Sequence, residues 1–167
     1  MMPWADQEGP PGLKAQVAQA RSFTGTVASL LGGIIASYVG RRRSYFLSSL
    51  LALFCAQYIF WTLNPTDDLF LWWVGALGFF SGFFFGWLPL FLPELFPTSV
   101  RSTGAGVSFN FGRILTAFAV LFAGTLASLF GGNYAQIGRV TSLFYAIGLI
   151  AIWFAPDTSQ RQLDDNT

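Results

Sequence analysis

A carboxylate and a guanidinium lie seven positions apart, at Glu94 and Arg101, in a short charged stretch between two long apolar segments. At this spacing the two side chains can pair where one segment turns into the next. Exposed ion pairs contribute only about 0–1 kcal/mol to stability. A pair at a closing junction contributes more while the junction is closed, and such a contact favours one conformation over another. The two residues are therefore candidates for a state-dependent contact at this junction.

Arg113 lies inside the second apolar segment. If a helix begins near Thr103, its rise of about 1.5 Å per residue places Arg113 about 15 Å along it, near the middle of a hydrocarbon core about 30 Å thick. A charge there costs at least about 2.5–3.5 kcal/mol, so we expect it to face a partner or a water-filled path. Asn110 and Thr116 are polar and lie close to the same face. Two roles stay open: binding an anionic substrate group, or structural pairing with a carbonyl or carboxylate.

The composition predicts a membrane protein. Hydrophobic residues make up 53% of the 167 residues, charged residues only 10%, and the mean hydropathy is +0.53. A soluble domain carries about 25% charged residues, so this chain cannot cover a globule with polar surface. Its 19 Phe and 6 Trp suit lipid and the membrane border.

Other classes of function find little support in the residues. With no His and one Cys, a disulfide framework and a Cys/His metal site are excluded, and we expect no cofactor. No nucleophile–base pair or phosphate-binding loop is present, which argues against an enzyme. A net charge of +1 gives no reason to expect a nucleic-acid partner.

Five apolar segments are long enough to cross a bilayer, which needs about 20 residues. Runs of this length without alternation favour helices over barrel strands. The sequence therefore predicts an all-α integral membrane protein of about five transmembrane helices. We expect a disordered lead over 1–21, a transmembrane domain over 22–156 with spans at 22–39, 45–63, 69–92, 103–130 and 134–155, and a tail over 157–167.

Lys and Arg placement predicts the orientation, because the cytoplasmic loops carry the excess. One side collects five such residues and the other side three, which are Arg41, Arg42, Arg43, Arg101 and Arg161 against Lys14, Arg21 and Arg139. We therefore expect a multi-pass protein of the cell membrane, inner or plasma, with its C-terminus in the cytoplasm and its N-terminus outside.

Small residues recur at every fourth position in the first, third and fourth segments, for example at Gly25, Ser29 and Gly33. Residues four apart share a helix face, and small ones let helices approach closely in lipid. Two readings stay open, a packing surface and a sliding surface of a moving transporter.

The run from Gly33 to Arg43 ends one segment and begins the next with three arginines. A plain positive-inside anchor explains it. The run also resembles the loop signature of the major facilitator superfamily, Gly-x3-Asp-Arg-x-Gly-x-Arg-Arg. Gly33, Gly40, Arg42 and Arg43 match, whereas Ser37 and Tyr38 replace the usual Asp and Arg.

Two further runs strengthen the resemblance. Pro-Glu-Leu-Phe-Pro-Thr-x-x-Arg-x-Thr-Gly-x-Gly, from Pro93, is similar to the sugar, metabolite and organic-acid proton symporters of that superfamily. Pro156-Asp157-Thr158-Ser159 resembles the Pro-Glu-Thr-Lys that closes many of these chains. The resemblance covers about Phe23 to Arg161 and corresponds to the eighth to twelfth helices of a twelve-helix fold, the C-terminal bundle without its seventh helix.

The resemblance implies roles for the residues singled out above. Glu94, Arg101, Arg42 and Arg43, with Gly33 and Gly40, would form a cytoplasmic gate that holds the outward-open state. Arg113, with Asn110 and Thr116, would bind substrate. The Phe-Asn-Phe-Gly-Arg run that ends at Arg113 looks like the sialate and monocarboxylate symporter branch, which favours an organic anion.

The leading hypothesis is a C-terminal portion of a secondary active transporter that moves a small polar metabolite, an organic anion or a sugar, by alternating access. Its partners would be membrane lipid, the small-molecule substrate, and the missing N-terminal half or a separate chain that supplies it. The predicted membrane core holds no Asp or Glu, so a proton-coupling group would lie in that other half. The alternative is a non-transporting membrane interaction subunit or an inactive truncated product.

Overall fold

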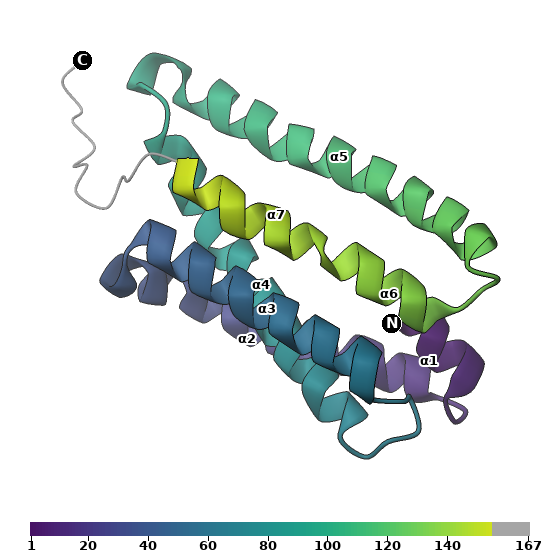
Figure 1. The fold of residues 1–167 in the computed structure, drawn as a ribbon. Helices are drawn as coiled ribbons and strands as arrows, with labels where there is room; N and C mark the ends of the chain where they lie inside the picture. Colours follow the sequence, from purple (N-terminus) through teal and green to yellow (C-terminus); the bar gives the residue numbers. More distant parts are fainter. Residues whose placement is uncertain (155–167) are drawn as a thin grey trace.

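The computed structural model describes residues 1–154, and this part of the chain folds into helices without strands. Five helical stretches are long and apolar enough to cross a membrane, as the sequence predicts. The elements, in chain order, are α1 (Met2–Glu8), α2 (Leu13–Val39), α3 (Arg41–Thr62), α4 (Phe70–Glu94), the short η1 (Thr98–Val100), α5 (Arg101–Leu129), α6 (Tyr134–Ser142), α7 (Phe144–Ala151) and the short η2 (Ile152–Phe154) (Figure 1).

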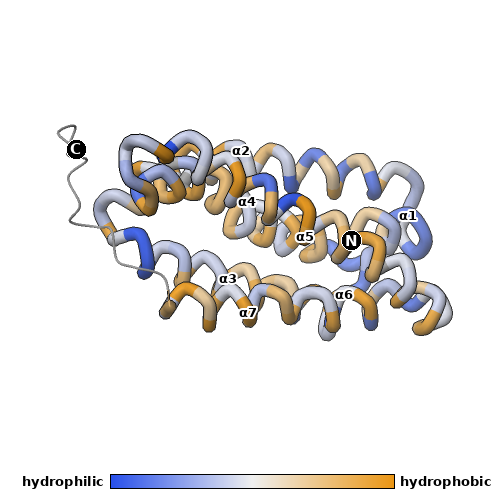
Figure 2. The backbone as a smooth tube through the Cα atoms, turned by 90° about the horizontal axis from the view of Figure 1, so that it is seen from above, coloured by the Kyte–Doolittle hydropathy of each residue, from blue (hydrophilic) through white to orange (hydrophobic). Residues whose placement is uncertain are grey.

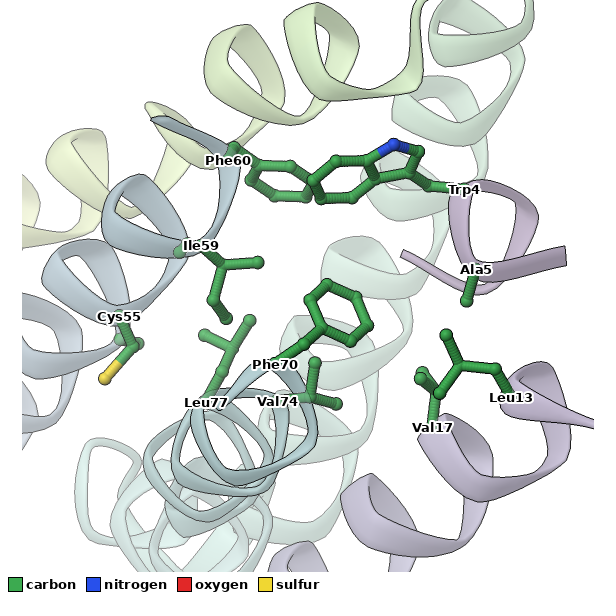
Figure 3. Close-up of a cluster of buried hydrophobic side chains, with 12 residues drawn as sticks. Trp4, Ala5, Leu13, Val17, Cys55, Ile59, Phe60, Phe70, Val74 and Leu77 are labelled. Atoms are coloured by element: carbon green, nitrogen blue, oxygen red, sulfur yellow. The ribbon is translucent and has the colours of Figure 1, made fainter. Parts of the chain in front are cut away.

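The expected disordered lead over residues 1–21 is instead helical. It holds α1 and the first turns of α2, joined at Gly12, whose φ of 90° suits the reversal of the chain. Trp4 is 2% exposed and stacks on Phe60 of α3, with ring centroids 5.6 Å apart. Figure 3 shows Trp4 above Phe70 of α4 as well. The lead folds because its apolar side chains find a core, which its local composition does not reveal.

The expected tail over 157–167, with Arg161, lies outside the described residues, as does the run from Pro156 to Ser159.

α2 and α4 make the most extensive helix–helix contact in the described part of the chain. Gly82 of α4 lies against the backbone of Gly25, and Gly86 lies against the backbone of Ser29, so closely that neither position has room for a Cβ atom. Close approach of backbones through small residues is how helices associate in lipid. At this crossing the small-residue surfaces are interlocked.

The last span is two helices rather than the continuous segment expected over 134–155, because the helix is interrupted at Leu143. The carbonyl of Arg139 would normally accept the amide of Leu143. It accepts instead from the Gln57 amide of α3 at 3.2 Å and from the Ser142 hydroxyl at 3.0 Å, while the Leu143 amide turns to Val140. Side chains inserted into the backbone ladder are a known cause of such breaks.

α5 lies along one side of the bundle (Figure 1), and its contacts in the described part of the chain are with α4, α6 and η1. Hydrophobic residues recur along the length of the long helices (Figure 2). On α5 most of the large ones are exposed: Val107 is 63% exposed and Leu121 69%. A helix that is apolar on most sides must be covered by lipid or by protein.

Candidate functional site

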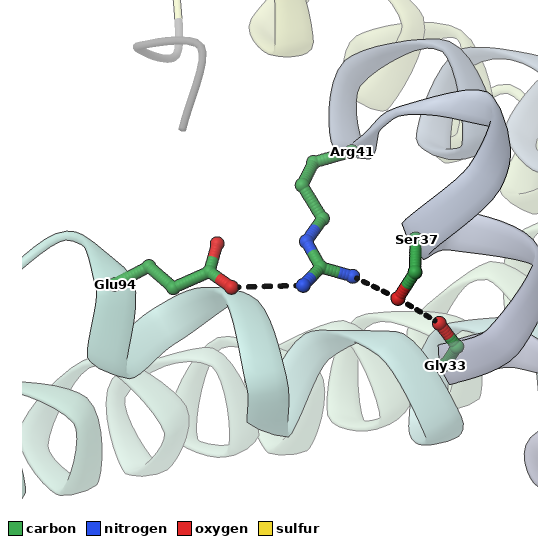
Figure 4. Close-up of polar contacts among 4 residues, drawn as sticks. All are labelled: Gly33, Ser37, Arg41 and Glu94. Atoms are coloured by element: carbon green, nitrogen blue, oxygen red, sulfur yellow. Dashed lines mark hydrogen bonds and ion pairs between the residues drawn. The ribbon is translucent and has the colours of Figure 1, made fainter. Parts of the chain in front are cut away.

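An ion pair joins the end of α4 to the start of α3. Gly40 separates α2 from α3, and its φ of 96° lets one helix follow the other without a loop. Arg41, the first residue of α3, donates from Nη2 to Glu94 Oε1 at 2.9 Å. The two side chains are only 16% and 14% exposed, so water screens this pair less than a pair on an open surface. Figure 4 shows the guanidinium lying between Glu94 and Ser37.

Ser37 occupies the position where the resembled signature has an aspartate. Its Oγ accepts a weaker contact from Arg41 Nη1 at 3.4 Å and donates to the Gly33 carbonyl at 2.8 Å. The hydroxyl therefore orients the guanidinium without neutralising it. The negative charge comes from Glu94 on α4, which is 53 positions from Arg41 in the sequence.

The other residues expected in the gate make different contacts. Arg42 donates to the Trp153 carbonyl at 2.8 Å, and Arg43 is exposed. Arg101 donates to Thr98 Oγ1 at 3.2 Å, within its own turn. The structure thus brings Glu94 together with Arg41, a residue that the motif comparison passed over. Among three consecutive arginines, only the helix phase and the placement of α4 decide which one meets the acid.

Arg113 and Thr116 line one hollow of about 890 Å³ between α4 and α5. Its other lining residues are Phe85, Leu88, Leu92, Ser108, Phe109, Gly112, Ala117 and Val120. Asn110 is not among them: its side-chain amide donates to the Gly106 carbonyl at 2.9 Å. The structure therefore brings together two of the three residues expected to bind substrate.

The hollow combines one guanidinium and two hydroxyls with apolar walls. Small-molecule sites are lined mostly by apolar groups with a few polar ones that fix orientation. Thr116 Oγ1 donates to the Gly112 carbonyl at 2.9 Å, so the oxygen keeps a lone pair for an outside donor. The Arg113 guanidinium beside apolar walls suits a small anion with an apolar body, and Thr116 can serve only as an acceptor for a donor group on such a molecule.

A second hollow is lined by Arg21, a cation to which the sequence motifs assign no role in a site. Arg21 lines a space of about 640 Å³ along α2 and α4, with hydroxyl groups from Ser22, Thr26, Ser29 and Ser81. The signal was present in the sequence, because hydroxyls at positions 22, 26 and 29 share one helix face. Within residues 1–154 no group of three His, Cys, Asp or Glu side chains is placed to hold a metal ion.

The chain matches the family model described as sugar (and other) transporter over residues 13–166. It is 34% identical to the probable 4-methylmuconolactone transporter of Cupriavidus pinatubonensis over 72% of the chain and 28% of that protein. It is 30% identical to the cis,cis-muconate transport protein of Acinetobacter baylyi over 71% of the chain and 30% of that protein. It is 32% identical to the inner membrane metabolite transport protein YhjE of Escherichia coli over 80% of the chain and 30% of that protein.

No solved structure matches the chain significantly. The chain spans between about a quarter and a third of the length of these relatives.

Proposed function

The chain belongs to the sugar and other transporter family of the major facilitator superfamily, and we propose that it is part of a secondary transporter that moves a small organic anion by alternating access. The observation that carries this proposal is Arg113, a permanent cation facing a hollow with apolar walls between α4 and α5. Because an arginine at this depth is costly unless it meets a partner or water, capture of a carboxylate accounts for its presence. Membership of a transporter family argues for transport rather than enzymatic catalysis as the class of function.

The names of two relatives support an organic acid, or its lactone, as the class of substrate, since one is named for cis,cis-muconate and the other for 4-methylmuconolactone. A sugar is the second choice, because the apolar lining of the hollow offers few partners for many hydroxyl groups. Thr116 and Ser108 would orient the substrate beside the arginine, and Asn110 would act only after releasing its helix carbonyl.

We place the gate at the Arg41–Glu94 pair, which ties the start of α3 to the end of α4. By this proposal the pair holds the cytoplasmic side closed and parts when that side opens, which biases the two conformations as a state-dependent contact does. Gly33 and Gly40 shape the junction. Arg101, Arg42 and Arg43 keep the surrounding surface positive on the cytoplasmic side of the cell membrane.

A complete transport path needs more helices than this chain has, since substrates of such carriers bind between two structural repeats. We propose that the remaining helices come from the other half of the transporter, on the same polypeptide or on a separate one. That half would also supply any proton-coupling carboxylate.

Uptake of labelled cis,cis-muconate tests this function. The chain is expressed in cells with and without the whole part of the Acinetobacter relative that precedes the region matched by this chain, so that the seventh helix is supplied as well. We expect uptake only from the pair, and a loss of tenfold or more in Arg113→Gln because a desolvated anion loses its charge partner. Arg113→Lys, which keeps the charge, should retain more uptake than Arg113→Gln. Equal uptake by all three forms would refute a substrate role for Arg113.

The second candidate is a non-transporting membrane subunit. It is favoured by Ser37, which replaces the acid of the resembled signature, so that the negative charge beside Arg41 comes from Glu94 on another helix. Correctly inserted pairs that move no labelled substrate of the organic-acid or sugar class would support this candidate.

A further inference from the structure

The start of α3 carries more positive charge than its described neighbours neutralise. Arg41, Arg42 and Arg43 occupy the first turn, where the helix dipole disfavours cations. Glu94 compensates Arg41. Arg42 donates to a neutral carbonyl, and among residues 1–154 neither Arg42 nor Arg43 forms a recorded ion pair. Two guanidinium groups next to each other therefore lack a counter-charge in the described part of the chain.

These two arginines line a hollow of about 350 Å³ together with Phe46, Ile152 and Trp153. The Arg42 guanidinium lies over the Trp153 ring, 5.3 Å from its centroid, and the Phe46 and Trp153 rings meet at an angle of 68° with centroids 5.8 Å apart. One wall of the hollow is thus cationic, and the other is aromatic and aliphatic. We name it the Arg42–Trp153 hollow.

The hollow lies where two spans end on the same side. Arg41 begins one span and Phe154 ends another, and the hydrogen bond from Arg42 to Trp153 joins them. Trp153 is 65% exposed and Phe154 86% exposed. Tryptophan is enriched at the depth of lipid headgroups, where its ring meets both water and hydrocarbon. We therefore expect the Arg42–Trp153 hollow to lie at the border between headgroups and acyl chains.

We propose that the Arg42–Trp153 hollow binds the headgroup of an anionic phospholipid. The lipid phosphate lies between Arg42 and Arg43, whose planar guanidinium groups suit bidentate contacts with phosphate oxygens. The glycerol and the first acyl carbons lie against Phe46 and Trp153. Anionic lipids give the cytoplasmic leaflet its negative surface potential, so this occupant is available at the side to which the arginines are assigned. A soluble anion would leave the aromatic wall uncovered, and lipid covers it.

Retention of phosphatidylglycerol tests the proposal. The full chain is reconstituted in discs of phosphatidylcholine and phosphatidylglycerol, extracted in mild detergent, and weighed by native mass spectrometry with its bound lipid. We expect phosphatidylglycerol to be retained over phosphatidylcholine. Arg43→Gln should reduce this retention about fivefold, the effect of one cation near a charged membrane surface. Trp153→Ala should also reduce it, because the glycerol loses its aromatic contact.

Lys14→Gln is the matched control, since it also removes one exposed positive charge. Lys14 lies at the start of α2, whereas the opposite end of α2 is the one that meets α3, whose first turn lines the hollow. It should retain as much phosphatidylglycerol as the parent chain. Circular dichroism establishes that each variant keeps its helix content, as expected for the exposed Arg43.

Three kinds of result would overturn the proposal. The first is a lack of selectivity, seen either as equal retention of the two lipids or as an equal loss of phosphatidylglycerol in Arg43→Gln and Lys14→Gln. The second is complete displacement of phosphatidylglycerol by soluble glycerol phosphate at millimolar concentration, which would assign the hollow to a free anion. The third is strong retention only in Asp157→Asn, which would show that the acidic segment after Phe154 fills the hollow.

Discussion

Arg41 is the arginine that pairs with Glu94, and geometry decides why it does so rather than one of its two neighbours. All three have the same chemistry, and each is close enough in sequence to Gly40 to belong to the junction. Within residues 1–154, the ion pair to Glu94 comes from Arg41, because the first turn of α3 directs it toward the end of α4. Since both partners of this pair are largely buried, its contribution should lie between the small value of an exposed pair and the larger loss on breaking a buried one.

A double-mutant cycle measures that contribution. Arg41→Gln and Glu94→Gln should each lower the stability of the full chain in detergent micelles by about 1–3 kcal/mol, because each removes one member of a largely buried ion pair. The double variant should be at least as stable as the less stable of the two single variants. Thermal unfolding followed by circular dichroism provides the readout.

Arg43→Gln is the control for this cycle, since it removes a neighbouring charge that is exposed. It should change stability by no more than about 0.5 kcal/mol. If the effects of Arg41→Gln and Glu94→Gln simply add in the double variant, the two residues are not coupled.

At the scale of elements, α2 and α4 form one unit. The sequence left open whether the small-residue surfaces pack or slide. At the α2–α4 crossing the backbones of Gly25 and Ser29 fit against Gly82 and Gly86 without room for a side chain. Such interlocking resists sliding, because a displacement of less than one helical turn would bring a larger neighbour into contact with the backbone. The arrangement favours a packing surface between α2 and α4. If helices move relative to one another, we expect the movement at their contacts with the other helices.

A single added methyl group tests that tightness. Gly86→Ala should destabilise the chain by about 1–3 kcal/mol, the range for overpacking, because its Cβ meets the backbone of Ser29. Gly106→Ala on α5 is the matched control, since nothing lies within 4 Å of its added Cβ. Alanine is about 1 kcal/mol better than glycine inside a helix, so this control should be neutral or stabilising. Equal melting temperatures for the two variants would contradict the interlocked crossing.

At the scale of the whole molecule, the described spans alternate in direction, so the junctions should fall on two sides of a membrane. Residue 99 lies between α4 and α5, whereas residue 68 precedes α4 and residue 136 lies in the first turn of α6. All three side chains are exposed, and the native Cys55 is only 3% exposed. Single cysteines at the three positions can therefore be labelled against a low background.

In membrane vesicles, a thiol reagent that cannot cross the bilayer should label Asp68→Cys and Gln136→Cys from one side and Ser99→Cys from the other. The excess of arginine predicts that residue 99 faces the cytoplasm. Labelling of all three from the same side would be incompatible with five crossing helices. Reversal of all three would keep the five crossings and correct only the orientation.

The sequence by itself determined the membrane class, the five spans and the family, because these depend on long apolar runs and on short motifs that keep their spacing. It also determined that Arg113 lies deep in a helix, since depth follows from a fixed rise per residue. Local patterns were enough for each of these properties.

Only the tertiary structure decided which groups meet. It paired Glu94 with Arg41, separated Asn110 from the hollow of Arg113 and Thr116, and folded the lead onto Phe60 and Phe70. It also broke the last span, through a glutamine 82 positions away from the carbonyl that it binds. These contacts depend on the phase and placement of helices that are distant in sequence. No local pattern contains that information, because partners at such separations meet only after the helices pack.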